Sequence, residues 1–188
     1  MKVKAGKKME EDNGKIGLNK INDLITKLGN SDGSVRENAR LALINIGKEA
    51  VHGLAETLSS KQEQLRWEAA KTLVSIADPV SVPALIKVLR DEIFDIRWLA
   101  AEALIAIGRD SIEPLLQTII NQSNDSFLQE GAHHIIAYLL PTLSKSPELV
   151  EILKPVKDAL DSSAPRSAGP AAAQQALEKM KHMKNNIT

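Results

Sequence analysis

The chain repeats a pattern of apolar positions whose spacing predicts amphipathic helices. Four similar blocks begin at residues 34, 64, 95 and 126, which gives a period of 30 or 31 residues. Within each block, apolar or small residues recur at offsets of four, four and three, and these offsets place them on one stripe of an α-helix. The four columns of the stripe are Val35, Leu65, Ile96 and Phe127; Ala39, Ala69, Ala100 and Gly131; Leu43, Leu73, Leu104 and Ile135; and Ile46, Ile76, Ile107 and Tyr138.

A second set of apolar residues lies between these blocks and predicts a partner helix in every repeat. Pro83 precedes one of these runs, where a proline in the first turn removes no internal hydrogen bond. Gly47 and Gly108 follow two of the blocks, as a helix end with positive φ requires. The paired positions are Leu24 and Leu28, Leu54 and Leu58, Leu85 and Leu89, and Leu116 and Ile120, while Asn30, Ser60 and Asp91 are candidate caps for the blocks that follow them.

The repeat loosens after Pro141, and the last segment predicts one divergent helix pair. Pro155 falls inside an apolar run there and is expected to kink or split its helix. We therefore predict an all-α fold, a right-handed α-solenoid of stacked antiparallel helix pairs. Its expected parts are a mobile Lys-rich arm at 1–17, four helix pairs at 18–140 and a capping pair at 141–188.

Composition narrows the possible chemistry. Lys plus Arg and Asp plus Glu both total 24, and the surplus of lysine at both ends leaves residues 21–169 at a net charge of −5. Without cysteine, the 188-residue chain has no thiolate metal site and no cysteine nucleophile. No apolar run approaches the roughly 18 residues that a membrane span needs. These features predict a cytoplasmic protein that uses no membrane contact and no cofactor.

The repeat motif resembles a known family. The pattern V-R-x-x-A-x-x-A-L-x-x-I-G occurs at residues 35–47, and it recurs with isoleucine in first place at residues 96–108. It is similar to HEAT repeats, and its short period resembles the HEAT-like subtype of phycobilin lyase subunits. The resemblance implies a helical solenoid, but proteins with this subtype include chromophore lyases, metal-dependent hydroxylases, DNA glycosylases and scaffolds. Fold alone therefore does not choose among these functions.

Two of these functions can be tested on residues. The hydroxylases carry a His-Glu pair after the repeat arginine, because imidazole and carboxylate groups bind iron. Here the pair is replaced by Glu37-Asn38, Trp67-Glu68 and Trp98-Leu99, so no metal site is expected. A glycosylase needs a basic groove that neutralises phosphates, whereas the body of this chain is acidic. Nucleic-acid binding would have to use the Lys-rich ends and is not expected.

Both tryptophans occupy the position after the repeat arginine, in adjacent repeats. If the second helix of each pair lines a concave face, Trp67 and Trp98 form an exposed aromatic pair, the composition of an interaction hot spot. The alternative is that each indole packs over its neighbour and fills a gap between repeats. The candidate partner-binding residues are Glu37, Arg40, Trp67, Lys71, Trp98, Glu102, Gln129 and His133.

The arginines of the repeat also allow two interpretations. Arg36, Arg66 and Arg97 could form an anion-binding ladder, but structural pairing with the preceding turn is favoured. Asp91 or Asp95 is expected to serve Arg97, whereas Arg66 has only Ser60, Glu63 and Gln64 nearby and is the least explained of the three.

The leading functional hypothesis is a non-catalytic scaffold that binds a protein or peptide on the concave face. The alternative is an enzyme subunit resembling the phycobilin lyases, which would hold a tetrapyrrole in the same concavity. In that case His133 could donate a proton to the chromophore.

Overall fold

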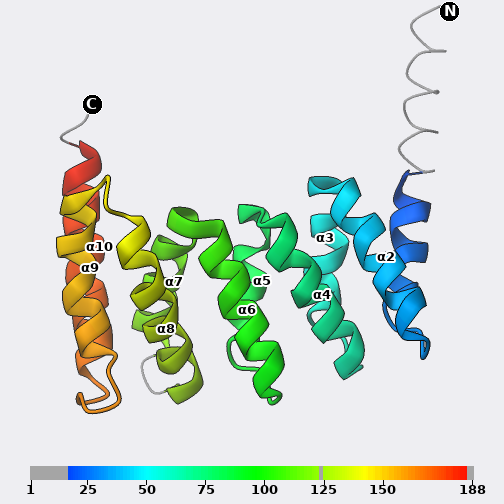
Figure 1. Ribbon diagram of the computed structural model, residues 1–188. Helices are drawn as coiled ribbons and strands as arrows, with labels where there is room; N and C mark the ends of the chain where they lie inside the picture. The colour runs from blue at the N-terminus through cyan, green and yellow to red at the C-terminus, as the bar shows by residue number, and fades with distance from the viewer. Residues whose placement is uncertain (1–16, 123–124, 186–188) are drawn as a thin grey trace, which may run out of the picture.

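The computed structural model describes residues 17–122 and 125–185, and these form a row of helix pairs (Figure 1). No strand occurs in the described part of the chain, so the predicted all-α solenoid is confirmed. The predicted arm falls on residues 1–16, which lie outside the described residues, and on residue 17, which is helical. After a first helical segment at residues 17–27, the elements are α2 (Gly33–Ile46), α3 (Lys48–Thr57), α4 (Glu63–Ile76), η1 (Pro79–Ser81), α5 (Val82–Val88), α6 (Phe94–Ile107), η2 (Gly108–Ser111), α7 (Ile112–Asn121), α8 (Ser126–Thr142), α9 (Pro147–Ala159) and α10 (Ala168–Asn185).

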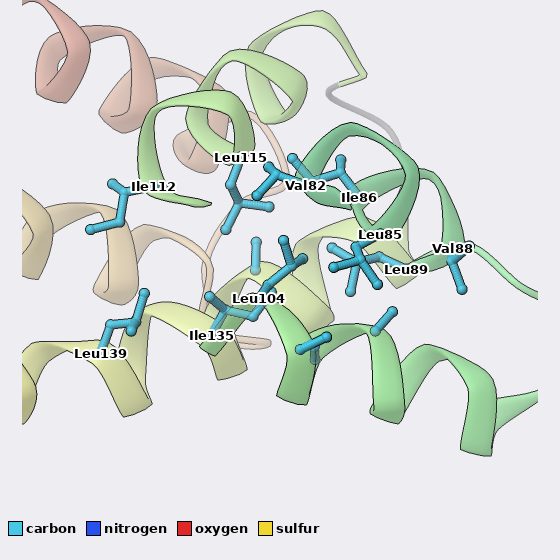
Figure 2. Packing of buried hydrophobic residues seen from close by; sticks show 14 of the residues in the cluster. Val82, Leu85, Ile86, Val88, Leu89, Leu104, Ile112, Leu115, Ile135 and Leu139 are labelled. Carbon is cyan, nitrogen blue, oxygen red and sulfur yellow. The ribbon is translucent and has the colours of Figure 1, made fainter. Parts of the chain in front are cut away.

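The helices stand in two layers with the core between them. Helices α2, α4, α6 and α8 form one layer, and α3, α5 and α7 lie behind them (Figure 1). Figure 2 shows how leucine and isoleucine side chains from both layers meet, among them Leu85, Leu104 and Ile135. All three are fully buried, as the apolar stripe predicts. We call the exposed side of α2, α4, α6 and α8 the second-helix face.

The fourth block is shifted by one residue from the register that its sequence suggests. Leu128 is buried where Phe127 was expected, and Phe127 is 43% exposed. The buried residues of α6 (Ile96, Ala100, Ala103 and Leu104) recur 32 residues later in α8 as Leu128, Ala132, Ile135 and Ile136. The predicted alignment of this block was therefore wrong by one position, because burial of leucine and alanine outweighed the match of Phe127 and Tyr138 to the apolar columns.

Two prolines lie inside helices without ending them. Pro141 is inside α8, one residue before its end, and Pro155 is inside α9, so Pro155 does not split its helix. Pro155 is exposed on α9, and the carbonyl group that it leaves without a donor can bind water on that side. The neighbouring Leu153 and Val156 stay fully buried and hold the helix against the core.

The predicted glycine ends are confirmed, but the predicted caps are not. Gly47 and Gly108 have φ values of 75° and 76°. In contrast, Asn30 accepts a hydrogen bond from the backbone N–H of Asp32, and it is Asp32 that caps α2 by accepting from Ser34. The residues expected to cap helices thus order the turn just before the cap.

The repeat arginines connect each second helix to the turn before it. In each case Nη1 donates to the backbone carbonyl six residues earlier, from Arg36 to Asn30 at 2.8 Å, from Arg66 to Ser60 at 3.0 Å and from Arg97 to Asp91 at 2.8 Å. The structural pairing that the sequence favours is therefore confirmed. The assignment of the Asp91 carboxylate was wrong, because it pairs with Arg66 of the preceding repeat.

Candidate interaction surface

Aromatic side chains are concentrated at one place on the second-helix face. The chain has only five Phe, Trp and Tyr residues, and four of them lie where α6 meets α8. Phe94 and Trp98 come from α6 and are 57% and 44% exposed, while Phe127 and Tyr138 come from α8 and are 43% and 58% exposed. Because large aromatic groups normally bury most of their surface, this cluster presents an unusually apolar patch to solvent.

Most of these rings contact one another in a row. The centroids of Phe94 and Trp98 lie 6.3 Å apart with their planes 30° from parallel. The indole of Trp98 then contacts the imidazole of His134 at 4.5 Å, and His134 contacts the ring of Tyr138 at 4.7 Å. Such contacts restrict the rotamers of the exposed rings, so the patch is partly preorganised for binding.

A hollow of about 320 Å³ lies beside this row. Its size is at the lower end of the range found for ligand pockets, roughly 300–1,000 Å³. The hollow is lined by Leu89, Phe94, Arg97, Trp98, Ala101, Phe127, Glu130, Gly131, His133, His134 and Ala137. We call this the α6–α8 hollow.

Charged groups of both signs border the α6–α8 hollow. The guanidinium carbon of Arg97 lies 4.1 Å from the centroid of the Phe127 ring, a cation–π contact. Nε2 of His134 lies 3.4 Å from Oε1 of Glu102, so this carboxylate already has a partner. Glu130 is exposed at the rim. The hollow therefore combines an apolar surface with polar groups that could orient a ligand.

A glycine in α8 lets the two layers approach closely here. A Cβ atom added to Gly131 would lie 3.2 Å from Cδ2 of Leu89, which is tighter than ordinary van der Waals contact. Leu89 follows α5 and is part of the buried core (Figure 2). The small residue at position 131 thus lets α8 pack against Leu89 and contributes to the floor of the hollow.

The second tryptophan lies elsewhere on the same face. Trp67 is half-buried against the core, and its ring is covered by Lys71, whose Nζ lies 4.4 Å from the centroid. It borders a different hollow, which it shares with Arg36, Ile93 and Asp95 among others. Trp67 and Trp98 thus face two separate depressions.

The other candidate residues divide in the same way. His133 lines the α6–α8 hollow, and Glu102 reaches its edge through His134. Glu37 is exposed on α2, and Arg40 donates to the buried carboxylate of Glu68 at 2.6 Å. The side-chain amide of Gln129 donates to the backbone carbonyl of Arg166 at 3.3 Å.

Sequence reasoning missed several residues of the hollow. Phe94 had no assigned role, and Phe127 was expected in the core. The one-residue shift in α8 puts His134 in the position equivalent to Glu102. A usable signal was present, because in a chain with 3% aromatic residues the four that cluster here fall at residues 94, 98, 127 and 138. Three of the four, Phe94, Trp98 and Phe127, lie in the first turns of α6 and α8, and this recurrence predicts proximity once the helices are paired.

The described residues show neither a metal cluster nor a membrane span. Within 17–122 and 125–185, no group of three or more His, Asp or Glu side chains is arranged to hold a metal ion. Over the same ranges, none of the helices has the combination of length and apolar character needed to cross a bilayer.

The stacked helix pairs and their repeated arginine contacts define a helical repeat protein. A family model described as HEAT repeats matches residues 21–105 and 51–137, which together span more than half of the chain. The chain therefore belongs to the HEAT-repeat family, as its motif indicates.

One of the similar solved structures shows the same fold. A chain from the complex of CpcE and CpcF of phycocyanin lyase from Nostoc sp. PCC7120 is similar, with a TM-score of 0.55 and 23% sequence identity, over 85% of this chain and 99% of that one. Two engineered proteins match with TM-scores of 0.41 and 0.38, at 23% and 22% identity, over 86% of this chain and 79% and 47% of theirs. The comparison with curated proteins found no match.

Proposed function

We propose that this chain is a non-catalytic scaffold that binds a peptide or protein on the second-helix face, centred on the α6–α8 hollow. The observation that carries the proposal is the exposure of three aromatic rings, those of Phe94, Trp98 and Phe127, that line one depression. Aromatic residues are enriched in the central, energetically dominant part of protein interfaces. The row from Phe94 to Tyr138 supplies such a centre, and the flanking charged groups supply a polar rim.

The proposal assigns unequal roles to the candidate residues. Trp98 and His133 would contact the partner directly, and Glu102 would hold His134 in place. Trp67 and Lys71 would form a secondary contact, one repeat away. Glu37, Arg40 and Gln129 would lie outside the centre of the interface.

The test is a comparison of captured proteins between variants. Wild-type protein, Trp98→Ala and Val80→Ala would each be immobilised and incubated with native lysate, and bound proteins identified by mass spectrometry. Val80 is 68% exposed in η1, so it serves as a control for loss of an exposed apolar side chain elsewhere. A partner retained by wild type and Val80→Ala but lost by Trp98→Ala supports the proposal. Equal capture by all three variants contradicts it.

A second candidate function is tetrapyrrole binding in the same hollow. It is favoured by the contact between the Trp98 indole and His134 beside an apolar depression, which suits a planar conjugated ligand. A structural neighbour named for phycocyanin lyase makes this candidate worth testing, although its 23% identity supports only the shared fold. Titration with biliverdin distinguishes the two candidates, because binding would shift the visible absorption of the pigment and Trp98→Ala would abolish the shift.

We also propose that the last helix pair closes the stack. Helix α10 packs against both α7 and α9 and buries one apolar side that includes Leu177 and Met180. Its Lys184 forms an ion pair with Glu113 of α7 at 2.6 Å. A terminal pair with one polar outer side protects the core from solvent, as the ends of repeat proteins require. Deletion of residues 168–188 should therefore lower the midpoint of thermal unfolding of the remaining chain, and an unchanged midpoint would contradict this role.

A further inference from the structure

The arginines of the second helices bind carboxylates with the edge of the guanidinium that faces the next repeat. Nε and Nη2 of Arg66 donate to the two carboxylate oxygens of Asp91 at 2.6 and 3.0 Å. Nε of Arg36 likewise donates to Oε1 of Glu68 at 3.1 Å. In both repeats Nη1 is occupied by backbone carbonyl groups, so one edge of the guanidinium fixes the turn and the other edge binds an acid.

Arg97 keeps the first of these contacts and lacks the second. Its Nη1 donates to the carbonyl groups of Asp91 and Glu92 at 2.8 and 3.2 Å. Among the described residues, however, no carboxylate lies within 4.0 Å of its guanidinium, and none accepts a hydrogen bond from Nε or Nη2. The ring of Phe127 covers it at 4.1 Å, and the side chain lines the α6–α8 hollow.

Helix α8 provides Arg97 with no acid at the position that corresponds to Glu68. Glu68 occupies the position of α4 that faces Arg36, and the equivalent position of α8 is Gly131. A glycine has no side chain to offer, and its close packing on Leu89 restricts larger residues there. Arg97 therefore lines the hollow without an acidic partner, whereas Arg36 and Arg66 are each paired with an acid of this chain.

The other charged groups at this hollow leave Arg97 available to an acid. Glu102 is paired with His134. The imidazole of His133 lines the hollow together with the guanidinium of Arg97. Glu130 is the one carboxylate lining the hollow in the described part of the chain. It is exposed at the rim, and it would oppose rather than assist an acidic ligand.

We propose that the partner segment inserts an Asp or Glu side chain, next to a large apolar residue, into the α6–α8 hollow. The carboxylate would accept hydrogen bonds from Nε and Nη2 of Arg97, in the fork geometry that Asp91 adopts on Arg66. The apolar neighbour would pack on Trp98 and Phe94. This inference rests on the proposed function and specifies the chemistry of its partner.

The test uses a random seven-residue peptide library, selected in parallel on wild-type protein, Phe127→Glu and Phe127→Gln. The Phe127→Glu substitution would place a carboxylate beside Arg97 and give it an acidic partner within the chain. The Phe127→Gln substitution removes the ring without adding charge. Peptides selected by wild type are then resynthesised with Asn or Gln in place of their acids. Binding is measured for each pair of peptides on all three proteins and on Trp98→Ala.

The proposal predicts that wild type selects acidic peptides and that neutralising the acid weakens binding by about tenfold or more, as expected for a hydrogen bond to a charged group. Phe127→Glu should lose this preference and Phe127→Gln should retain it, while Glu130→Gln should bind the acidic peptides more tightly. Selected peptides that need Trp98 but carry no acid would overturn the inference and leave the proposed function intact. Peptides that bind equally well to Trp98→Ala, or no selected peptide at all, would contradict both.

Discussion

Arg66 and Asp91 form a two-pronged ion pair across neighbouring repeats, with Nε–Oδ2 and Nη2–Oδ1 distances of 2.6 and 3.0 Å. Their side chains are 10% and 8% exposed. The hydrogen bonds that Arg66 donates to the Asp91 carboxylate raise the pKa of Arg66 above its usual value, against the opposing effect of burial. The pair joins the turn before α4 to the turn before α6, because Arg66 also donates to the carbonyl of Ser60.

Asp91→Ala should therefore destabilise the fold by about 3 kcal/mol, since it removes the two-pronged acid from a largely buried guanidinium. Only the exposed carboxylate of Glu92 then remains, 3.7 Å from Nη2 of Arg66. It also removes the hydrogen bond that the Asp91 carboxylate accepts from the backbone N–H of Ile93. Urea unfolding followed by circular dichroism measures the change. Asp23→Ala is the control, because the Lys27–Asp23 pair has the same 2.6 Å distance but is exposed, and its loss should change stability by about 0.5 kcal/mol or less. Similar losses for both variants would mean that the buried pair contributes no more than a surface pair.

A second prediction concerns the start of α2. Hydrogen bonds from the side chain and backbone of Ser34 lower the pKa of Asp32 below its ordinary value of 3.8. A lowered pKa means that the ionised carboxylate stabilises the folded state at pH values above 3.8, and that this contribution disappears as the pH falls through the folded-state pKa.

Asp32→Ala should consequently lower the midpoint of thermal unfolding at pH 7 more than at pH 3. Asp32→Asn is the matched control, because asparagine also caps helices but does not titrate. It should stay close to wild type at neutral pH and show a weaker dependence on pH. A difference between wild type and Asp32→Ala that is constant from pH 7 to pH 3 would exclude a contribution from the carboxylate charge.

A third prediction separates the two tryptophans. Trp98 is 44% exposed beside the α6–α8 hollow, whereas Trp67 is half-buried beneath Lys71. Acrylamide should therefore quench the fluorescence of the Trp67→Phe variant, which retains Trp98, more strongly than that of Trp98→Phe. Binding of a peptide in the hollow should protect the first variant and leave the second unchanged. Equal quenching of both would contradict the difference in exposure.

The repeat motif predicted the fold because the residues of each apolar column occupy the buried side of a helix. The columns of α2, α4 and α6 were assigned correctly, and Ala39, Ala69 and Ala100 are all buried. Partners across repeats were harder to predict, since Arg66 and Asp91 are 25 residues apart and only the stacking of pairs brings them together. The candidate site was hard to predict for the same reason. The contact between Trp98 and His134 joins two repeats and depends on the register of α8 against α6.

That register supplies the last prediction. The sequence pattern placed Phe127 in the core column, but the structure buries Leu128 completely and leaves Phe127 43% exposed. Leu128→Ala should therefore destabilise the protein by about 3 kcal/mol, within the range for truncating a buried leucine. Phe127→Ala removes a larger side chain, yet it should reduce stability by only about 1 kcal/mol, because the ring is 43% exposed and lies against the guanidinium of Arg97. Chemical denaturation of the two single variants decides between the registers. A larger loss for Phe127→Ala than for Leu128→Ala would restore the register that the columns suggest, and would move His133 rather than His134 beside Trp98.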